Sequence, residues 1–247
     1  MTPILELRGV SKSFRALMVL NDISFTLDPG EALGVLGPNG AGKTTMLNLI
    51  SGDLPVSSGQ ILFQGGDITH TPAERRCHLG IGRTAQIPRP FAKMTVFENV
   101  LVAATYGRGK GERDSYALCR DILRQTALFE KRDVLGGSLR ILDRKRLELA
   151  RALATEPTLL LLDEIAGGLT DHEVVELLEV IAGIRARGIT IIWIEHIVHA
   201  LLSSVDRILA INFGTKLAEG LPRQVIESPE FQEIYFGVES VRLEGSR

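Results

Sequence analysis

The apolar residues of this chain fall into short continuous runs that alternate with longer amphipathic stretches. Residues 31–36, 159–162 and 190–194 are such runs. Runs of this length indicate strands that are buried on both faces, as in a parallel sheet covered by helices. The stretches between them have the spacing of amphipathic helices. The pattern therefore predicts an α/β fold.

Strands of a second kind are predicted in the first third of the chain. Residues 4–10 alternate between apolar and polar positions, residues 19–27 contain another strand, and residues 57–68 are typical of a turn, a strand and a turn. We expect these segments to form an antiparallel β subdomain beside the parallel core. Further strands are expected at residues 80–86, 205–213 and 216–220.

The helical pattern is concentrated in the middle of the chain. Thr95-Val96-Phe97-Glu98 has the spacing of a capping box, and no strand pattern interrupts the stretch from Thr95 to about Arg151. Residues 93–154 are therefore predicted to form a helical lobe. The lobe is inserted into a single domain, 1–247, whose α/β core comprises residues 1–92 and 155–247. Helices are expected at residues 44–50, 99–105, 114–128, 143–154, 171–187 and 222–236.

Residues 37–45 carry the most specific motif of the chain. They fit G-x-x-x-x-G-K-[ST] in full and lie between a predicted strand and a predicted helix. The backbone N–H groups of such a loop and the N-terminus of the helix bind phosphate, Lys43 would reach the β- and γ-phosphates, and the Thr44 hydroxyl would bind Mg²⁺. The motif indicates a nucleoside triphosphate but does not distinguish kinases, GTPases, motors and transport ATPases. The expected nucleotide-binding residues are Gly37, Pro38, Asn39, Gly40, Ala41, Gly42, Lys43, Thr44 and Thr45.

Two of the apolar runs end in polar residues that suit phosphate chemistry. The run at residues 159–162 is followed by Asp163 and Glu164, and the run at residues 190–194 leads to His196. Because ligands of open α/β sheets bind at the carboxyl ends of the strands, we expect these side chains near the phosphates. Asp163 would hold Mg²⁺, Glu164 would orient and deprotonate the attacking water, and His196 would contact the γ-phosphate. Each of them in isolation would be an ordinary solvated or structural residue.

Two more candidates depend on where the fold places them. Gln86 ends a predicted strand. It is a catalytic residue and a metal ligand only if it lies beside the phosphates, and a solvated loop residue otherwise. Phe14 lies in a predicted polar loop between two strands. There it either packs onto the core or offers a platform on which adenine stacks.

The composition excludes several classes of function. A net charge of −2 and a pI near 6.2 give no electrostatic footprint for nucleic acid, and an aromatic content of 5% does not suggest base-stacking platforms. Cys77 and Cys119 are isolated, which argues against a disulfide framework or a structural metal and fits a reducing cytosol. No apolar run is long enough to span a membrane, and the N-terminus lacks the pattern of a signal peptide.

In their order and spacing, these motifs resemble those of the nucleotide-binding subunits of ATP-binding-cassette (ABC) transporters. Residues 37–45, Gln86, residues 159–164 and His196 match four ordered motifs of that family, and Phe14 matches its adenine-stacking aromatic. The resemblance covers nearly the whole chain. It implies a P-loop NTPase of the ABC type with a RecA-like parallel-sheet core, acting as an ATPase that uses ATP and Mg²⁺.

Within the family, four segments are similar to the ATPases of branched-chain (hydrophobic) amino-acid importers. They are residues 82–86, 94–103, 194–196 and 234–237. The resemblance implies a second ABC ATPase subunit, a paralogue or a copy of this chain, and two integral-membrane permease subunits. A periplasmic solute-binding protein would act indirectly. The chain would then be cytoplasmic and peripheral on the inner face of the cell membrane.

One family motif departs from its usual sequence. The signature Leu-Ser-Gly-Gly-Gln caps the ATP of the opposite subunit, and its distance from Arg151 places it on residues 139–143. The serine and both glycines are missing, so Ile141 and Leu142 would hinder close backbone approach. Arg140 and the N–H groups of a helix beginning at Asp143 would remain as contacts. We hypothesise an unusual signature face, paired with an ATPase whose signature is intact. The positions assigned in trans are Leu139, Arg140, Ile141, Leu142 and Asp143.

Two other classes are compatible with a phosphate-binding loop. A soluble ABC ATPase of DNA repair or translation would show tandem cassettes, coiled-coil insertions or basic arms, and the sequence has none of these. A P-loop small-molecule kinase would need a lid and an acceptor site. It would also leave Gln86, residues 159–164 and His196 unexplained together.

Overall fold

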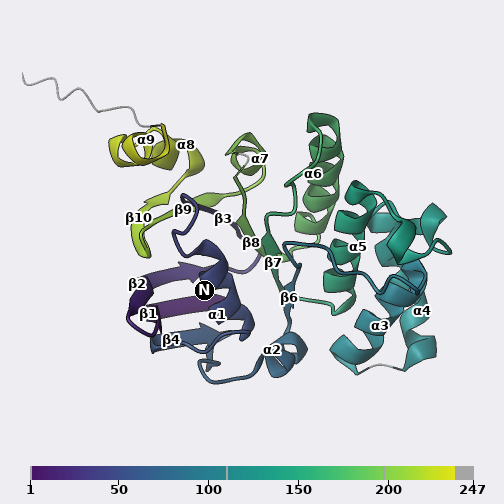
Figure 1. Ribbon diagram of the computed structural model, residues 1–247. Helices are drawn as coiled ribbons and strands as arrows, with labels where there is room; N and C mark the ends of the chain where they lie inside the picture. Colours follow the sequence, from purple (N-terminus) through teal and green to yellow (C-terminus); the bar gives the residue numbers. More distant parts are fainter. Residues whose placement is uncertain (1, 110, 197, 237–247) are drawn as a thin grey trace, which may run out of the picture.

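Two β-sheets organise the chain (Figure 1), which the computed structural model describes over residues 2–109, 111–196 and 198–236. The larger sheet has the strand order β10-β9-β3-β8-β7-β6, and the smaller has the order β2-β1-β4-β5. The strands are β1 (Leu5–Phe14), β2 (Leu17–Leu27), β3 (Ala32–Leu36), β4 (Ser58–Phe63), β5 (Gly66–Asp67), β6 (Ile81–Arg83), β7 (Leu159–Asp163), β8 (Thr190–Ile194), β9 (Arg207–Asn212) and β10 (Thr215–Gly220).

The larger sheet is parallel from β9 to β6, and β10 joins its edge as the antiparallel arm of a hairpin. β3, β7 and β8 are buried at every position. Their side chains alternate between two hydrophobic cores, so that Leu160 and Leu162 face one core while Leu159 and Leu161 face the other. The continuous apolar runs of the sequence are thereby explained, and the predicted α/β class is confirmed.

Helices cover the two faces of the larger sheet in different ways. α1 packs in one core together with the antiparallel sheet, whereas α3, α4, α5 and α6 pack in the other core (Figure 1). Of the described helices, none is long and apolar enough to cross a membrane. The helices are α1 (Lys43–Ser51), α2 (Ala73–Leu79), α3 (Val96–Arg108), α4 (Glu112–Gln125), α5 (Ile141–Ala154), α6 (Asp171–Arg185), α7 (Val198–Leu202), α8 (Pro222–Ile226) and α9 (Pro229–Phe236), with 3₁₀ turns η1 (Phe129–Lys131) and η2 (Gly136–Ser138).

Several element boundaries differ from the sequence prediction. Phe14 is not in a polar loop: it is the last residue of β1 and pairs with Leu17, because the hairpin turns tightly at Arg15, which has a φ of 55°. β6 ends at Arg83, which leaves Gln86 in the loop that follows. α2 was not predicted; its terminal carbonyls are bonded by the N–H of Gly80 in the left-handed conformation.

Two helix boundaries also differ. α5 begins at Ile141, two positions before the predicted Asp143, with Arg140 as its N-cap. α6 ends at Arg185 with Ala186 as its C-cap, whereas the helix was predicted to reach residue 187. The N–H of Gly188 bonds to the Arg185 carbonyl in the turn beyond the helix. The capping box at Thr95 and Glu98 is present at the start of α3, as predicted.

Candidate functional site

The glycine loop between β3 and α1 forms a phosphate cradle whose glycines are required by close packing. A Cβ on Gly37 would lie 2.3 Å from the Ile211 carbonyl oxygen, and one on Gly42 would lie 2.6 Å from Leu20 Cδ2. Gly42 has a φ of 100° and is the N-cap of α1. The loop therefore adopts a backbone path that only glycine allows, as expected for a chain that wraps around phosphate.

Lys43 is buried inside the cradle and is held by the cradle itself. Its Nζ donates to the carbonyl oxygens of Gly37 at 2.7 Å and Pro38 at 3.0 Å. Burial lowers the pKa of Lys43 from its ordinary value, while Glu164 and Asp163 oppose that shift. Next to it lies a cavity of about 290 Å³, lined by Val19, by residues 39–45, and by Gln86 and Glu164.

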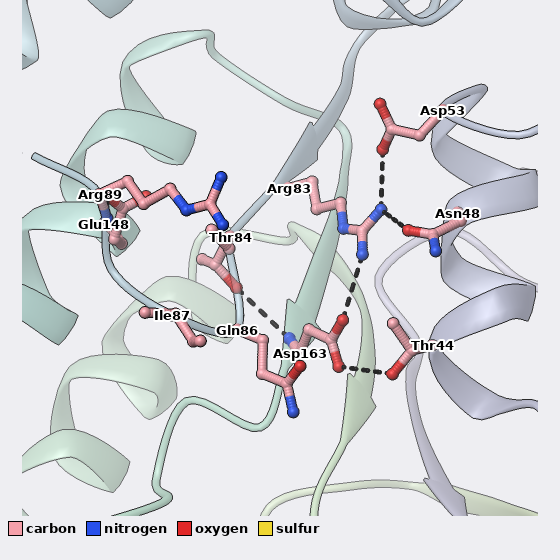
Figure 2. Close-up of a pocket in the computed structure, with 11 residues that line it drawn as sticks. Thr44, Asn48, Asp53, Arg83, Thr84, Gln86, Ile87, Arg89, Glu148 and Asp163 are labelled. Atoms are coloured by element: carbon pink, nitrogen blue, oxygen red, sulfur yellow. Dashed lines mark hydrogen bonds and ion pairs between the residues drawn. The ribbon is translucent and has the colours of Figure 1, made fainter. Parts of the chain in front are cut away.

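Thr44 and Asp163 lie side by side in a position that suits Mg²⁺, which we call the magnesium corner. Thr44 Oγ1 lies 3.4 Å from Asp163 Oδ1, and the carboxylate is fully buried at the end of β7 (Figure 2). Burial raises the pKa of Asp163, and the Arg83 guanidinium opposes this shift. A hydroxyl beside one carboxylate is the kind of hard-oxygen donor set with which Mg²⁺ joins a protein to a nucleotide phosphate. The residues therefore fit the ion.

Glu164 contacts the other two residues that were predicted to be catalytic, Gln86 and His196. Its Oε2 accepts a hydrogen bond from Gln86 Nε2 at 2.6 Å, and its Oε1 lies 2.6 Å from His196 Nε2. Glu164 itself has a φ of 49°, a left-handed conformation that costs a non-glycine residue about 1–3 kcal/mol. The loop after β7 is thus strained in a way that aims this carboxylate at the cradle.

Two buried charged residues that sequence reasoning missed brace this loop. Lys145 Nζ donates to the backbone oxygens of Gln86 and Glu164, each at 3.3 Å. Glu195 Oε1 accepts from the Ala166 N–H at 2.7 Å. Burial lowers the pKa of Lys145 and raises the pKa of Glu195. Glu195 could have been suspected from its place beside His196, whereas nothing in the local pattern singled out Lys145.

The comparison with known families decides the identity of this site. Residues 20–167, which include the cradle, Asp163 and Glu164, match the sequence model of the family described as ABC transporter. The chain belongs to the ATP-binding proteins of ABC transporters. Its two-sheet arrangement is accordingly the ABC ATP-binding cassette fold, and the chain is an ABC transporter ATPase.

The relatives of this ABC ATPase include proteins of two different transport systems. The branched-chain amino acid transport ATP-binding protein LivG of Escherichia coli K12 is 35% identical, over 95% of this chain and 98% of its own length. The lipopolysaccharide export ATP-binding protein LptB of Acidithiobacillus ferridurans is also 35% identical, over 96% and 98%. The crystal structure of the ADP conformation of MJ1267, an ATP-binding cassette of an ABC transporter, matches with a TM-score of 0.88 at 29% identity, over 96% of this chain and all of that one.

Residues 139–143, the segment expected to carry the signature, are more buried than the sequence suggested. Leu139 and Leu142 are buried, and so is Asp143, whose Oδ2 accepts from Lys131 Nζ at 2.5 Å. Arg140 and Ile141 are the two exposed positions of this segment. The prediction that all of residues 139–143 face a partner therefore needs correction, because Asp143 forms an ion pair within its own chain.

Gly136 and Gly137 precede this segment, and their backbone N–H groups are hydrogen-bonded within the chain. The N–H of Gly136 donates to the Met94 carbonyl at 2.8 Å, and the N–H of Gly137 donates to the Ala92 carbonyl at 3.1 Å. These backbone groups are therefore not available to a nucleotide. The placement of the signature at residues 139–143 stays a prediction.

Phe14 lies apart from the phosphate cavity. Its side chain is 44% exposed, and Lys12 Nζ lies 5.1 Å from the centre of its ring. It does not line the cavity beside the cradle. Its exposed ring at the end of β1 is compatible with stacking on a base, and it does not pack as a core residue.

Proposed function

We propose that this ABC ATPase is the ATP-hydrolysing subunit of an importer for branched-chain or related amino acids. The similarity to LivG at 35% identity supports this substrate class, as do the four segments that resemble the ATPases of such importers. The observation that carries the hydrolytic part is the position of Glu164, which Gln86 and His196 hold at the wall of the phosphate cavity.

In the proposed reaction, the γ-phosphate occupies the cradle and Lys43 exchanges the two loop carbonyls for phosphate oxygens. Thr44 and Asp163 would hold Mg²⁺, with Gln86 as a further ligand, and the ion would neutralise charge on the phosphates. Glu164 orients the attacking water and accepts its proton. His196 fixes Glu164 through the 2.6 Å contact and reaches toward the γ-phosphate.

The adenine would stack on Phe14, whose ring is exposed at the end of β1. The second face of the nucleotide would come from a partner ATPase, because ABC ATPases work with a second cassette and with permeases. Residues 93–154 would act as the helical lobe that, with Gln86, transmits closure to two permease subunits. The chain would accordingly lie in the cytoplasm on the inner face of the membrane, with a periplasmic binding protein delivering the solute to the permease.

Lipopolysaccharide export is the second candidate, since LptB of Acidithiobacillus ferridurans has the same identity to this chain. An ABC ATPase does not contact the transported molecule, so the residues described here favour neither substrate by chemistry. The segments quoted from the sequence favour the amino-acid importer. A soluble ABC ATPase without permeases is the third possibility.

The test is to express this chain with the membrane proteins encoded beside its gene and to purify the complex through a tag on this chain. We expect permease subunits to copurify and leucine uptake into reconstituted vesicles to depend on ATP. Lys43→Ala, which removes the cation of the cradle, should abolish uptake while the complex remains assembled. Copurification without leucine uptake, but with lipopolysaccharide extraction, would replace the importer with the exporter. No membrane partner at all would favour the soluble class.

A further inference from the structure

The guanidinium of Arg83 lies at the centre of a group of oxygen atoms beside the magnesium corner (Figure 2). Its Nη2 donates to Asp163 Oδ2 at 3.1 Å. Its Nη1 donates to Asp53 Oδ2 at 2.8 Å and to Ser51 Oγ at 3.1 Å, and it also contacts Asn48 Oδ1. We call these four side-chain oxygens, of Asn48, Ser51, Asp53 and Asp163, the oxygen cage.

Arg83 and the oxygen cage around it together come from three elements, α1, β6 and β7, and from the turn after α1. Arg83 is the last residue of β6, which pairs with β7, and Asp163 is the last residue of β7. The other members come from α1 and the turn after it. The side chain of Arg83 is 19% exposed and that of Asp163 is 0% exposed. The guanidinium is therefore a mostly buried charge that is paired and hydrogen-bonded, as a buried charge must be.

The two oxygens of Asp163 have different neighbours. Oδ1 lies beside the Thr44 hydroxyl, on the side where Mg²⁺ would bind, whereas Oδ2 is paired with Arg83. Within the described part of the chain, Arg83 is the cation within ion-pair distance of this carboxylate. Lys43, the other nearby cation, donates to loop carbonyls instead. Arg83 thus occupies Oδ2 of the carboxylate and leaves Oδ1 to a metal ion.

The donors of the oxygen cage are also those of a divalent-cation site. Two carboxylates, an amide oxygen and a hydroxyl are hard-oxygen ligands of the kind that Mn²⁺ and Mg²⁺ take in proteins. A resident positive charge at their centre repels a second cation and occupies its ligands. Asp53 and Asp163 both line a cleft of about 530 Å³ that is open to solvent, so a divalent ion could reach them if that charge were removed.

We propose that Arg83 is a specificity-determining residue that occupies the oxygen cage in place of a divalent ion. It thereby reserves Asp163 for one metal, bound on the Thr44 side together with the nucleotide phosphates. In the absence of ATP, the charge of Arg83 keeps the affinity for a free divalent cation low. This inference rests on the proposed metal role of Asp163 and goes beyond the ATPase assignment.

The test is a titration with Mn²⁺ in the absence of nucleotide, followed by the electron paramagnetic resonance signal of the free ion. We expect Arg83→Gln and Arg83→Met to bind Mn²⁺ at least about tenfold more tightly than the wild-type chain, because a neighbouring positive charge is removed. Arg83→Lys keeps the charge and should bind as the wild type does. Arg124→Gln, which removes an exposed arginine paired with Asp121, is the control for net charge.

A second substitution locates the gained ion. Asp53→Asn in the Arg83→Gln background should return the Mn²⁺ affinity to the wild-type value, because it removes one carboxylate of the oxygen cage. Wild-type affinity in both neutral Arg83 variants would overturn the proposal, as would a gain that Asp53→Asn leaves intact. ATP hydrolysis by the wild-type chain is measured in the same preparation, so a failure of the ATPase assignment is seen separately.

Discussion

Among the site residues, Glu164 has contacts on both carboxylate oxygens and a fixed backbone conformation, as a general base requires. Both of its carboxylate oxygens are engaged, by Gln86 and by His196, and its backbone is held in a strained conformation. We predict that Glu164→Gln retains ATP binding within about threefold of the wild type, because the amide replaces the carboxylate at similar volume. Turnover should fall at least about 100-fold, since the acceptor of the water proton is lost.

Binding of a fluorescent ATP analogue and phosphate release measure the two effects of Glu164→Gln separately. Glu179→Gln, the same substitution at an exposed position of α6, is the matched control and should change neither. Full turnover in Glu164→Gln would remove this residue from the role of general base.

At the scale of the elements, α9, the last of the described helices, is hydrogen-bonded to the nucleotide site. Tyr235 of α9 accepts a hydrogen bond from the Gly37 N–H at 2.6 Å, and its ring stacks on Phe231, which is fully buried. The turn between β9 and β10 holds the same loop, since the Gly214 N–H donates to the Ala41 carbonyl at 3.1 Å. The shape of the cradle therefore depends on the C-terminal elements.

We predict that Tyr235→Phe weakens ATP binding by about fivefold or more, because the N–H of Gly37 loses its acceptor at a cost of about 1–3 kcal/mol. Urea unfolding and ATP titration measure stability and affinity on the same preparation. Tyr116→Phe is the control, since the Tyr116 hydroxyl bonds to Glu112 on an exposed face of α4. A loss of stability with unchanged ATP affinity would leave Tyr235 with a purely structural role.

At the scale of the whole molecule, the signature segment predicts unequal sites in a complex of two different ATPases. The ATP bound by this chain would be capped by the partner's intact signature. Of the side chains in this segment, the ATP bound by the partner would meet those of Arg140 and Ile141, because Asp143 is paired with Lys131 and Leu142 is buried. The site that contains Glu164 should then carry most of the hydrolysis.

The asymmetry is tested in the purified heteromeric complex. We predict that Glu164→Gln in this chain removes most of the ATPase activity, whereas the equivalent glutamate substitution in the partner removes little. Phosphate release by the two variant complexes, at matched subunit content, gives the comparison. Equal losses would contradict the asymmetry, since two equivalent sites would then be contributing.

Much of the fold and of the site could be predicted because the decisive features are local. A continuous apolar run is a buried strand wherever it occurs, and the glycine loop at residues 37–45 determines its own backbone path. Glu164 and His196 meet because parallel strands end at the same edge of the sheet. The errors were at element ends, such as Phe14 and the start of α5, where one or two hydrogen bonds decide the boundary.

The sequence by itself thus determined the fold class, the phosphate cradle and the pair of acids, since each depends on neighbours within a few residues or on the direction of a strand. Only the tertiary structure revealed the ion pair of Arg83 with Asp163 and the contact of Tyr235 with Gly37. It also decided that Asp143 turns inward to Lys131. These contacts join residues from separate segments, and no local pattern states which distant partner a side chain will meet.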